Sequence, residues 1–262
     1  MIDEKTLQKS LSGRLIGQNV IYLKTVDSTN EHAFGLARKG ASEGTVILAD
    51  EQTKGKGRLQ RVWHSPPGRN IYTSVILRPP LKPAVAPQIT LMAGVAVADL
   101  LSHYGVRGVS LKWPNDVQIG DRKVCGILTE MKALGEQVDF VIVGIGLNVN
   151  MQKEDFDAGI RERATSIREE TGTVISRQEL AAQLYHHLEK WYKVLLKEGF
   201  PPVRERWLAF AGILGRKIRM DPGKDAQRGE VVGVDEDGAL LIRNEGGLRQ
   251  RVITGDIIVE RD

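Results

Sequence analysis

The sequence predicts an α+β fold: a mixed, mostly antiparallel sheet flanked by helices, followed by a small C-terminal β barrel. Short runs of apolar and β-branched residues bounded by Gly-containing turns are typical of strands. Residues 87–104 have the apolar face of a long helix. After Gly212, five short strand-like runs follow in about 50 residues, which is the pattern of a small barrel. We therefore predict two domains, residues 1–212 and 213–262.

The N-terminal part of the chain supplies the first strands of the sheet. A short helix is expected at residues 3–11. Ser28, with Glu31 three residues later, has the form of a capping box, and the helix that it starts continues to Gly40. Residues 55–68 form a loop rich in Gly, Pro and Arg. The strands predicted here are residues 20–24, 45–49 and 70–77.

The centre of the chain completes the sheet. Pro114 ends one strand, and Gly120 with the two residues after it forms a hairpin turn between the next two. Residues 138–147 are apolar over most of their length, as in a strand covered on both faces. The strands predicted here are 109–113, 117–119, 123–131 and 138–147. Helices are then predicted at 165–171, 177–197 and 202–211, and barrel strands at 217–220, 229–234, 239–243, 248–253 and 257–260.

The composition is that of a globular protein. Of its 262 residues, 41% are hydrophobic and 27% are charged. The single cysteine excludes an internal disulfide and a cysteine cluster for zinc. The longest nearly apolar stretch, residues 89–98, is too short to cross a bilayer, and the acidic N-terminus has no apolar signal-peptide region. We expect a cytoplasmic protein that does not enter a membrane.

Positive charge is concentrated in one stretch. The formal net charge is +4, yet residues 52–98 contain no Asp or Glu. That stretch holds seven cations: Lys54, Lys56, Arg58, Arg61, Arg69, Arg78 and Lys82. A local positive field attracts phosphates, carboxylates, nucleic acids or acidic partners.

The first chemical motif is the loop that begins within this stretch. Gly55 and Gly57 alternate with Lys56 and Arg58, so the backbone can approach a ligand closely and turn its N–H groups toward an anion. The phosphate-binding pattern G-x-x-x-x-G-K-[ST] is absent, and G-x-G-x-x-G fails because Gln60 stands where glycine is required. From composition alone, a solvated basic loop is an equally good interpretation.

The second motif, residues 112–116, ends a strand. Asp116 could contribute an oxygen ligand to Mg²⁺. The alternative is a β-turn in which Asn115 and Asp116 only satisfy the backbone, and this is favoured when the motif is taken alone.

In the third motif, Lys123 opens a buried-looking strand and Gly126 leaves room for a ligand ring. A hairpin lysine that points to water is the alternative. Regular alternation places Gly126 on the face of Val124 and Leu128, and Cys125 on the side of Lys123. Because no base can be assigned to Cys125, a packed core thiol is the better interpretation than a nucleophile.

The fourth motif is residues 143–150. Gly144 and Gly146 clear one face of a buried strand, which favours close approach of a ligand or of another backbone. Asn148 could hydrogen-bond a sugar or a phosphate; tight sheet packing is the alternative. The five histidines form no metal-binding or triad pattern.

Taken together, these segments resemble the biotin protein ligase family, the biotin–[acetyl-CoA-carboxylase] ligases. The matching segments are DSTN at 27–30, EQTKGKGRLQRVWHSPPGRNIY at 51–72, KWPND at 112–116, DRKVCGILTE at 121–130 and VGIGLNVN at 143–150. The resemblance continues weakly through the C-terminal region and covers nearly the whole chain. It implies a class II synthetase-like core and an SH3-like C-terminal barrel.

The resemblance also implies a two-step reaction. Biotin and ATP, with Mg²⁺, give biotinyl-5′-AMP, and the biotinyl group then passes to a lysine of a biotin carboxyl carrier domain of acetyl-CoA carboxylase or another biotin enzyme. Two anions must meet in the first step, so cations are needed to lower their repulsion. No covalent nucleophile of the enzyme is needed.

Residue by residue, the resemblance implies three groups. Lys123 and Arg58 are implied as catalytic, with Lys123 between the biotin carboxylate and the α-phosphate. Biotin contacts are implied for Ser28, Thr29, Asn30, Gln52, Gly55, Lys56, Gly57, Arg58, Lys123, Gly126 and Gly144. ATP contacts are implied for Lys56, Arg58, Trp63, Asn115 and Asn148.

Two departures from the family pattern affect these expectations. Lys56 replaces an arginine of the usual loop and loses its bidentate fork, and Gln60 replaces its last glycine. Only 19 residues precede the strand predicted at Val20, too few for a helix-turn-helix unit. We therefore expect a monofunctional ligase that does not bind DNA. Exposed strand edges would permit a homodimer.

Three alternatives remain open. A lipoate or octanoate ligase or transferase has a related fold and related chemistry, although KWPND and the GKGR-type loop favour biotin. A nucleic-acid-binding protein would use the basic stretch, with affinity that falls steeply with salt. A biotin-binding sensor would lack catalysis.

Overall fold

The computed structural model describes residues 2–221 and 228–260. Its main element is a seven-stranded sheet with the order β1-β2-β3-β7-β6-β5-β4. Only β1 and β2 pair in parallel, which confirms the predicted mixed, mostly antiparallel sheet. The strands are β1 Val20–Val26, β2 Val46–Gln52, β3 Ile71–Leu77, β4 Val109–Lys112, β5 Asp116–Ile119, β6 Arg122–Leu134 and β7 Gln137–Leu147.

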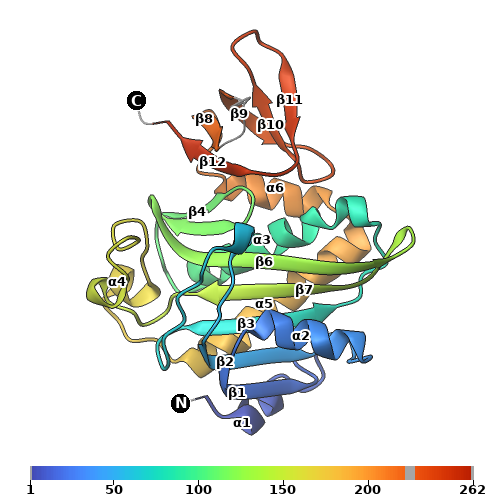
Figure 1. The fold of residues 1–262 in the computed structure, drawn as a ribbon, viewed down its shortest axis with the longest axis vertical. Helices are drawn as coiled ribbons and strands as arrows, with labels where there is room; N and C mark the ends of the chain where they lie inside the picture. Colours follow the sequence, from blue (N-terminus) through green and yellow to red (C-terminus); the bar gives the residue numbers. More distant parts are fainter. Residues whose placement is uncertain (1, 222–227, 261–262) are drawn as a thin grey trace.

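Helices cover both faces of this sheet (Figure 1). On one face, α2 (Thr29–Arg38) packs against β2, β3 and β7. On the other, α3 (Pro87–His103) contacts β4–β7 and packs against α5 (Arg177–Glu198), and α6 (Pro201–Phe210) contacts α3. Alternate residues of β2 therefore enter different cores: Ile47 packs with α2, whereas Val46 and Leu48 join the main core. The remaining α-helices are α1 Glu4–Ser10 and α4 Ile167–Thr171.

Helix α3 lies at the centre of the main core. Together with the 3₁₀ turn Pro83–Val85, it forms a segment long and apolar enough, by length and composition, to cross a membrane. The apolar stretch at residues 89–98, which was judged too short to cross a bilayer, is therefore only part of this longer segment. Most of the segment is buried inside the protein, as in the core helix of a globular fold.

The C-terminal region forms a second sheet beside α6 (Figure 1). Its five antiparallel strands have the order β11-β10-β9-β8-β12. Among the described residues, the edge strands β11 and β12 do not pair, so we describe a sheet and not a closed barrel. The strands are β8 Lys217–Asp221, β9 Arg228–Val234, β10 Leu240–Arg243, β11 Arg249–Val252 and β12 Asp256–Val259. The domain boundary at residue 212 stays a prediction.

Local details depart from the sequence predictions at three places. Ser28 begins α2 as predicted, but its side chain makes no capping hydrogen bond, so the capping contact expected from the sequence is absent. The β6–β7 hairpin is longer than predicted, with Gly135 in its turn. Short 3₁₀ turns also occur at Arg58–Gln60 and Lys153–Asp155.

Candidate active site

One cavity of about 850 Å³ collects the four motifs. It lies between the loop at residues 55–68, the glycines of β6 and β7, the turn between β4 and β5, and the C-terminal sheet. The predicted residues on its wall are Ser28, Thr29, Asn30, Gln52, Lys56, Gly57, Arg58, Trp63, Asn115, Asp116, Lys123, Gly126, Gly144 and Asn148. Gly55 is not on the wall; a Cβ there would lie 2.3 Å from the carbonyl oxygen of Trp63.

A polar network fixes one end of the cavity. The N–H and the hydroxyl of Thr29 donate to Gln52 Oε1 at 2.9 and 3.1 Å. Gln52 Nε2 donates to Ser65 Oγ at 3.0 Å. Beneath them, the buried hydroxyl of Ser74 lies 2.8 Å from Thr29 Oγ1 and 2.6 Å from Asn30 Oδ1. These side chains are held in place by one another before any ligand arrives.

The amide of Asn30 has one defined orientation. Its Nδ2 donates to the carbonyl oxygen of Leu128 at 3.1 Å and to Glu130 Oε2 at 2.7 Å, and both of these groups can only accept. A Cβ on Gly144 would lie 2.1 Å from Asn30 Oδ1. Only glycine at residue 144 therefore leaves room for the Asn30 amide against strand β7.

Trp63 lies over a second pair of glycines. Gly126 and Gly146 face each other on β6 and β7. A Cβ would come within 2.8 Å of the Trp63 ring at Gly126 and within 2.4 Å at Gly146. The two glycines form a flat patch of backbone on which the indole lies, and the amine of Lys123 is 5.3 Å from the ring centroid.

A β-bulge turns Lys123 into the cavity. Val117 pairs with Cys125 while Gln118 pairs with Lys123, so β6 has one extra residue at this point. Lys123 therefore shares the cavity face with Gly126, whereas Val124 and Cys125 are both fully buried. Regular alternation predicted the wrong side for Val124 and Cys125 because it does not account for the bulge.

Cys125 is a packed core thiol, which confirms the interpretation favoured from the sequence. It is fully buried, and burial raises the pKa of its thiol. A neutral, enclosed thiol has no nucleophilic role in the cavity.

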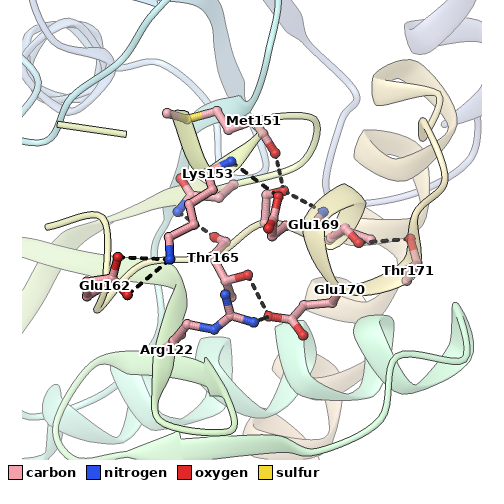
Figure 2. Close-up of polar contacts among 11 residues, drawn as sticks. Arg122, Met151, Lys153, Glu162, Thr165, Glu169, Glu170 and Thr171 are labelled. Carbon is pink, nitrogen blue, oxygen red and sulfur yellow. Dashed lines mark hydrogen bonds and ion pairs between the residues drawn. The ribbon is translucent and has the colours of Figure 1, made fainter. Parts of the chain in front are cut away.

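The backbone of Lys123 is anchored by the segment that follows β7. Its N–H donates to the carbonyl oxygen of Arg163 at 2.8 Å, and its carbonyl accepts from the N–H of Thr165 at 2.9 Å. Figure 2 shows the polar contacts that hold this segment: Glu170 Oε1 receives both Arg122 Nη2 and the hydroxyl of Thr165, each at 2.6 Å. The position of the catalytic candidate thus depends on ion pairs beyond the cavity wall.

Asp116 faces Lys123 within the site. Its Oδ1 is 2.5 Å from Lys123 Nζ, and both side chains are partly buried. Among the described residues, no three His, Cys, Asp or Glu side chains are grouped so that they could hold a metal ion. The proposed metal role of Asp116 stays a prediction, and the contact that the structure shows is an ion pair.

The basic loop is neutralised by acids from other elements. Lys56 pairs with Glu31 of α2, and this hydrogen bond raises the pKa of Lys56. Arg58 and Arg61 both reach Asp256 of β12. The acid-free stretch of sequence is therefore not a bare positive field in the folded protein.

The loop is also strained at the position where it departs from the family pattern. Leu59 and Gln60 have φ values of 54° and 59°, in the left-handed region that favours glycine. A glycine at residue 60 would adopt this conformation without strain.

The two asparagines predicted to border a nucleotide are tied to the backbone. Asn115 Nδ2 donates to the carbonyl oxygen of Ile127 at 2.8 Å, and Asn115 Oδ1 accepts from Arg58 at 3.2 Å. Asn148 Nδ2 donates to the carbonyl oxygen of Thr165 at 3.0 Å. Both help to shape the wall.

Two family models match the chain. Residues 22–148 match the biotin/lipoate A/B protein ligase family, and residues 213–259 match the biotin protein ligase C-terminal domain. The bifunctional ligase/repressor BirA of Bacillus subtilis is 36% identical over 256 residues, which cover 98% of this chain and 78% of that protein. The chain belongs to the biotin protein ligase family. It is thus an enzyme of a family that ligates biotin.

The chain is also similar to two other ligases of this family. The biotin–[acetyl-CoA-carboxylase] ligase of Paracoccus denitrificans is 36% identical over 231 residues, which cover 86% of this chain and 94% of that protein. The biotin protein ligase of Aquifex aeolicus, solved with biotin and ATP, superposes with a TM-score of 0.79 at 33% identity. The match covers 94% of this chain and 100% of that one.

Three residues beside this site were not predicted from the sequence, and Gly146 was noted as clearing a strand face but was not assigned to the site. Ser74, Glu130 and Asp256 each contact a predicted residue, and Gly146 lies under Trp63. Gly146 had a sequence signal, because it alternates with Gly144. The other three had none, since their partners lie 44 to 198 residues away along the chain.

Proposed function

We propose that this protein joins biotin to a lysine of a biotin carboxyl carrier domain through biotinyl-5′-AMP, with ATP as the second substrate. The observation that carries the proposal is the place of Lys123. Its amine lies in the same cavity as the Thr29–Asn30–Gln52 network and as Arg58 and Asn115. The names of the relatives and the biotin and ATP in the Aquifex aeolicus structure support the choice of substrates.

The polar network suits the ureido ring of biotin. Both N–H donors of the Asn30 amide are used within the protein, so Asn30 can contact a ligand only as an acceptor, through Oδ1. Gln52 Nε2 has one N–H left after its bond to Ser65. An acceptor and a donor at this end match the N–H and the C=O of the ureido group.

The first step joins two anions. An oxygen of the biotin carboxylate attacks the α-phosphorus of ATP, the P–O bond to the β-phosphate breaks, and pyrophosphate leaves with the electron pair. Lys123 and Arg58 stabilise the negative charge of the transition state, and the cavity holds the reacting groups in line.

The second step moves the biotinyl group to the carrier. The neutral amine of the carrier lysine attacks the acyl carbon, the bond to the phosphate oxygen breaks, and AMP leaves. The amine loses one proton in forming the amide. The reaction passes through no enzyme-bound acyl group, in agreement with the buried state of Cys125.

The described residues do not form a metal cage of their own. Asp116 is the acid nearest to Lys123 and is already paired with it. We therefore assign no step to a protein-bound metal ion; Mg²⁺ enters the proposal only with ATP, whose phosphates it binds. A cytoplasmic location, where ATP is present, is part of the same proposal.

Pyrophosphate release tests the first step. The protein is incubated with ATP and Mg²⁺ alone, with added biotin, or with added lipoate. We expect release only with biotin, and biotinyl-5′-AMP as the product identified by mass spectrometry. Release with lipoate but not with biotin would favour a lipoate ligase, because the family model that matches residues 22–148 includes both biotin and lipoate ligases.

A further inference from the structure

Strand β12 of the C-terminal sheet lines the cavity with Asp256 and the three residues that follow it, and Asp256 is the acidic side chain among them. Asp256 opens β12, and its two carboxylate oxygens contact two arginines of the loop. Arg58 Nη1 is 3.2 Å from Oδ1, and Arg61 Nη2 is 2.6 Å from Oδ2. The carbonyl of Gly255 accepts a further bond from Arg58 Nη2 at 3.2 Å.

Asp256 is held firmly enough to act as an anchor. Gly255 has a φ of +127°, and a Cβ there would lie 2.4 Å from Met220 Cε on the neighbouring strand β8. β12 itself pairs with β8 from Asp256 onward. The carboxylate is thus fixed to the C-terminal sheet, and only 22% of its side chain is exposed.

Besides Asp256, the loop tip is held by polar contacts, the Lys56–Glu31 pair and the 3.2 Å bond from Arg58 Nη1 to Asn115 Oδ1, and not by apolar packing. Leu59 is 66% exposed and Val62 is 84% exposed, so neither packs into a core. Leu59 also has a left-handed backbone conformation. Ion pairs with guanidinium groups are the strong, directional contacts available to such a segment.

We propose that Asp256 is a positioning residue for ligation: it holds Arg58 and Arg61 so that the loop is closed over the cavity when ATP binds. This inference rests on the proposed function. A guanidinium has five N–H donors, so Arg58 can keep its bond to Asp256 and still present other donors to a phosphate. Asp256 therefore acts through Arg58 and does not touch the reacting atoms.

The test compares Asp256→Asn with Asp237→Asn. Asp237 lies in the turn between β9 and β10 of the C-terminal sheet and pairs with Arg251 at 2.6 Å, away from the cavity wall, so it controls for the loss of an acidic side chain in this region. We expect Asp256→Asn to lower kcat/KM for ATP at least about fivefold, because Arg58 is then held less firmly against the phosphates both in the bound state and in the transition state. Asp237→Asn should match the wild type.

Limited trypsin digestion gives a readout that does not depend on activity. Cleavage after Lys54, Lys56 and Arg58, the sites that all variants share, should be at least about fivefold faster in Asp256→Asn than in the wild type or Asp237→Asn, because the segment opens more often. Arg61→Gln should act in the same direction. In the double variant, the fold increase in cleavage rate should be smaller than the product of the two single-variant increases, because both changes break the same contact.

Trypsin cleavage equal to that of the wild type, or an unchanged kcat/KM for ATP, in a folded Asp256→Asn protein would overturn the inference. If Asp256→Asn fails to fold, Arg61→Gln decides: its cleavage rate must rise and its kcat/KM for ATP must fall. If the wild type releases no pyrophosphate with biotin, the proposed function fails, and the trypsin comparison still decides the role of Asp256.

Discussion

Lys123, the proposed catalytic lysine, is positioned by several parts of the surrounding structure. A bulge in β6 turns it into the cavity, Asp116 pairs with its amine, and its backbone is bonded to the segment after β7. Its type and place were predicted from sequence. Its orientation was not, because it depends on the register with β5.

Replacing Lys123 should abolish adenylation without unfolding the protein. Lys123→Met keeps the length of the side chain and removes the charge, so we expect the rate of biotin-dependent pyrophosphate release to fall about 100- to 1,000-fold. Lys132→Met is the matched control, since Lys132 lies on the same strand but pairs with Asp139 outside the cavity wall. Equal activity of the two variants would remove Lys123 from the mechanism.

The state of Cys125 can be tested by alkylation. Burial raises the pKa of its thiol, so the thiol stays protonated in the folded protein at pH 8 and no thiolate is exposed. Iodoacetamide should modify the native protein at least about 100-fold more slowly than the protein unfolded in guanidinium chloride. Modification at the rate of an exposed thiol would contradict the core assignment.

At the scale of elements, the order of helices and strands was predictable because apolar periodicity and turn residues are local signals. The bulge in β6, and the pairing of Gly126 with Gly146 across two strands, depend on partners that a single segment does not reveal. The glycines of β7 gave the clearest signal of a cleared face. The side chains that occupy that face, Asn30 and Trp63, could not be assigned from sequence.

Gly144→Ala tests the cleared face of β7. The added Cβ would lie 2.1 Å from Asn30 Oδ1, so Asn30 must leave its bonds to Ser74 and Glu130. We expect the KM for biotin to rise at least about tenfold, and the free energy of unfolding to fall by about 1–3 kcal/mol through overpacking.

Gly159→Ala is the control for Gly144→Ala, since no heavy atom lies within 4 Å of a Cβ at that position. Steady-state kinetics and urea unfolding measure the two effects. A Gly144→Ala protein with the wild-type KM for biotin would show that Asn30 does not contact the substrate.

At the scale of the whole molecule, the net charge of +4 is a poor guide to the site. Folding brings Glu31 to Lys56, Asp116 to Lys123 and Asp256 to both loop arginines. Those acids come from three different elements, one of them in the C-terminal sheet. These cations could be located in the sequence, but only the tertiary structure shows that each already has an acidic partner.

Labelling of a carrier tests the central claim most directly. The protein is incubated with ATP, Mg²⁺ and an apo biotin carboxyl carrier domain, with biotin or lipoate supplied separately, and the carrier is weighed by mass spectrometry. We expect a mass increase of one biotinyl group with biotin, none with lipoate, and labelling at least about 100-fold slower when Lys123→Met replaces the wild type. Modification with lipoate only, or no modification with biotin, would contradict the central claim.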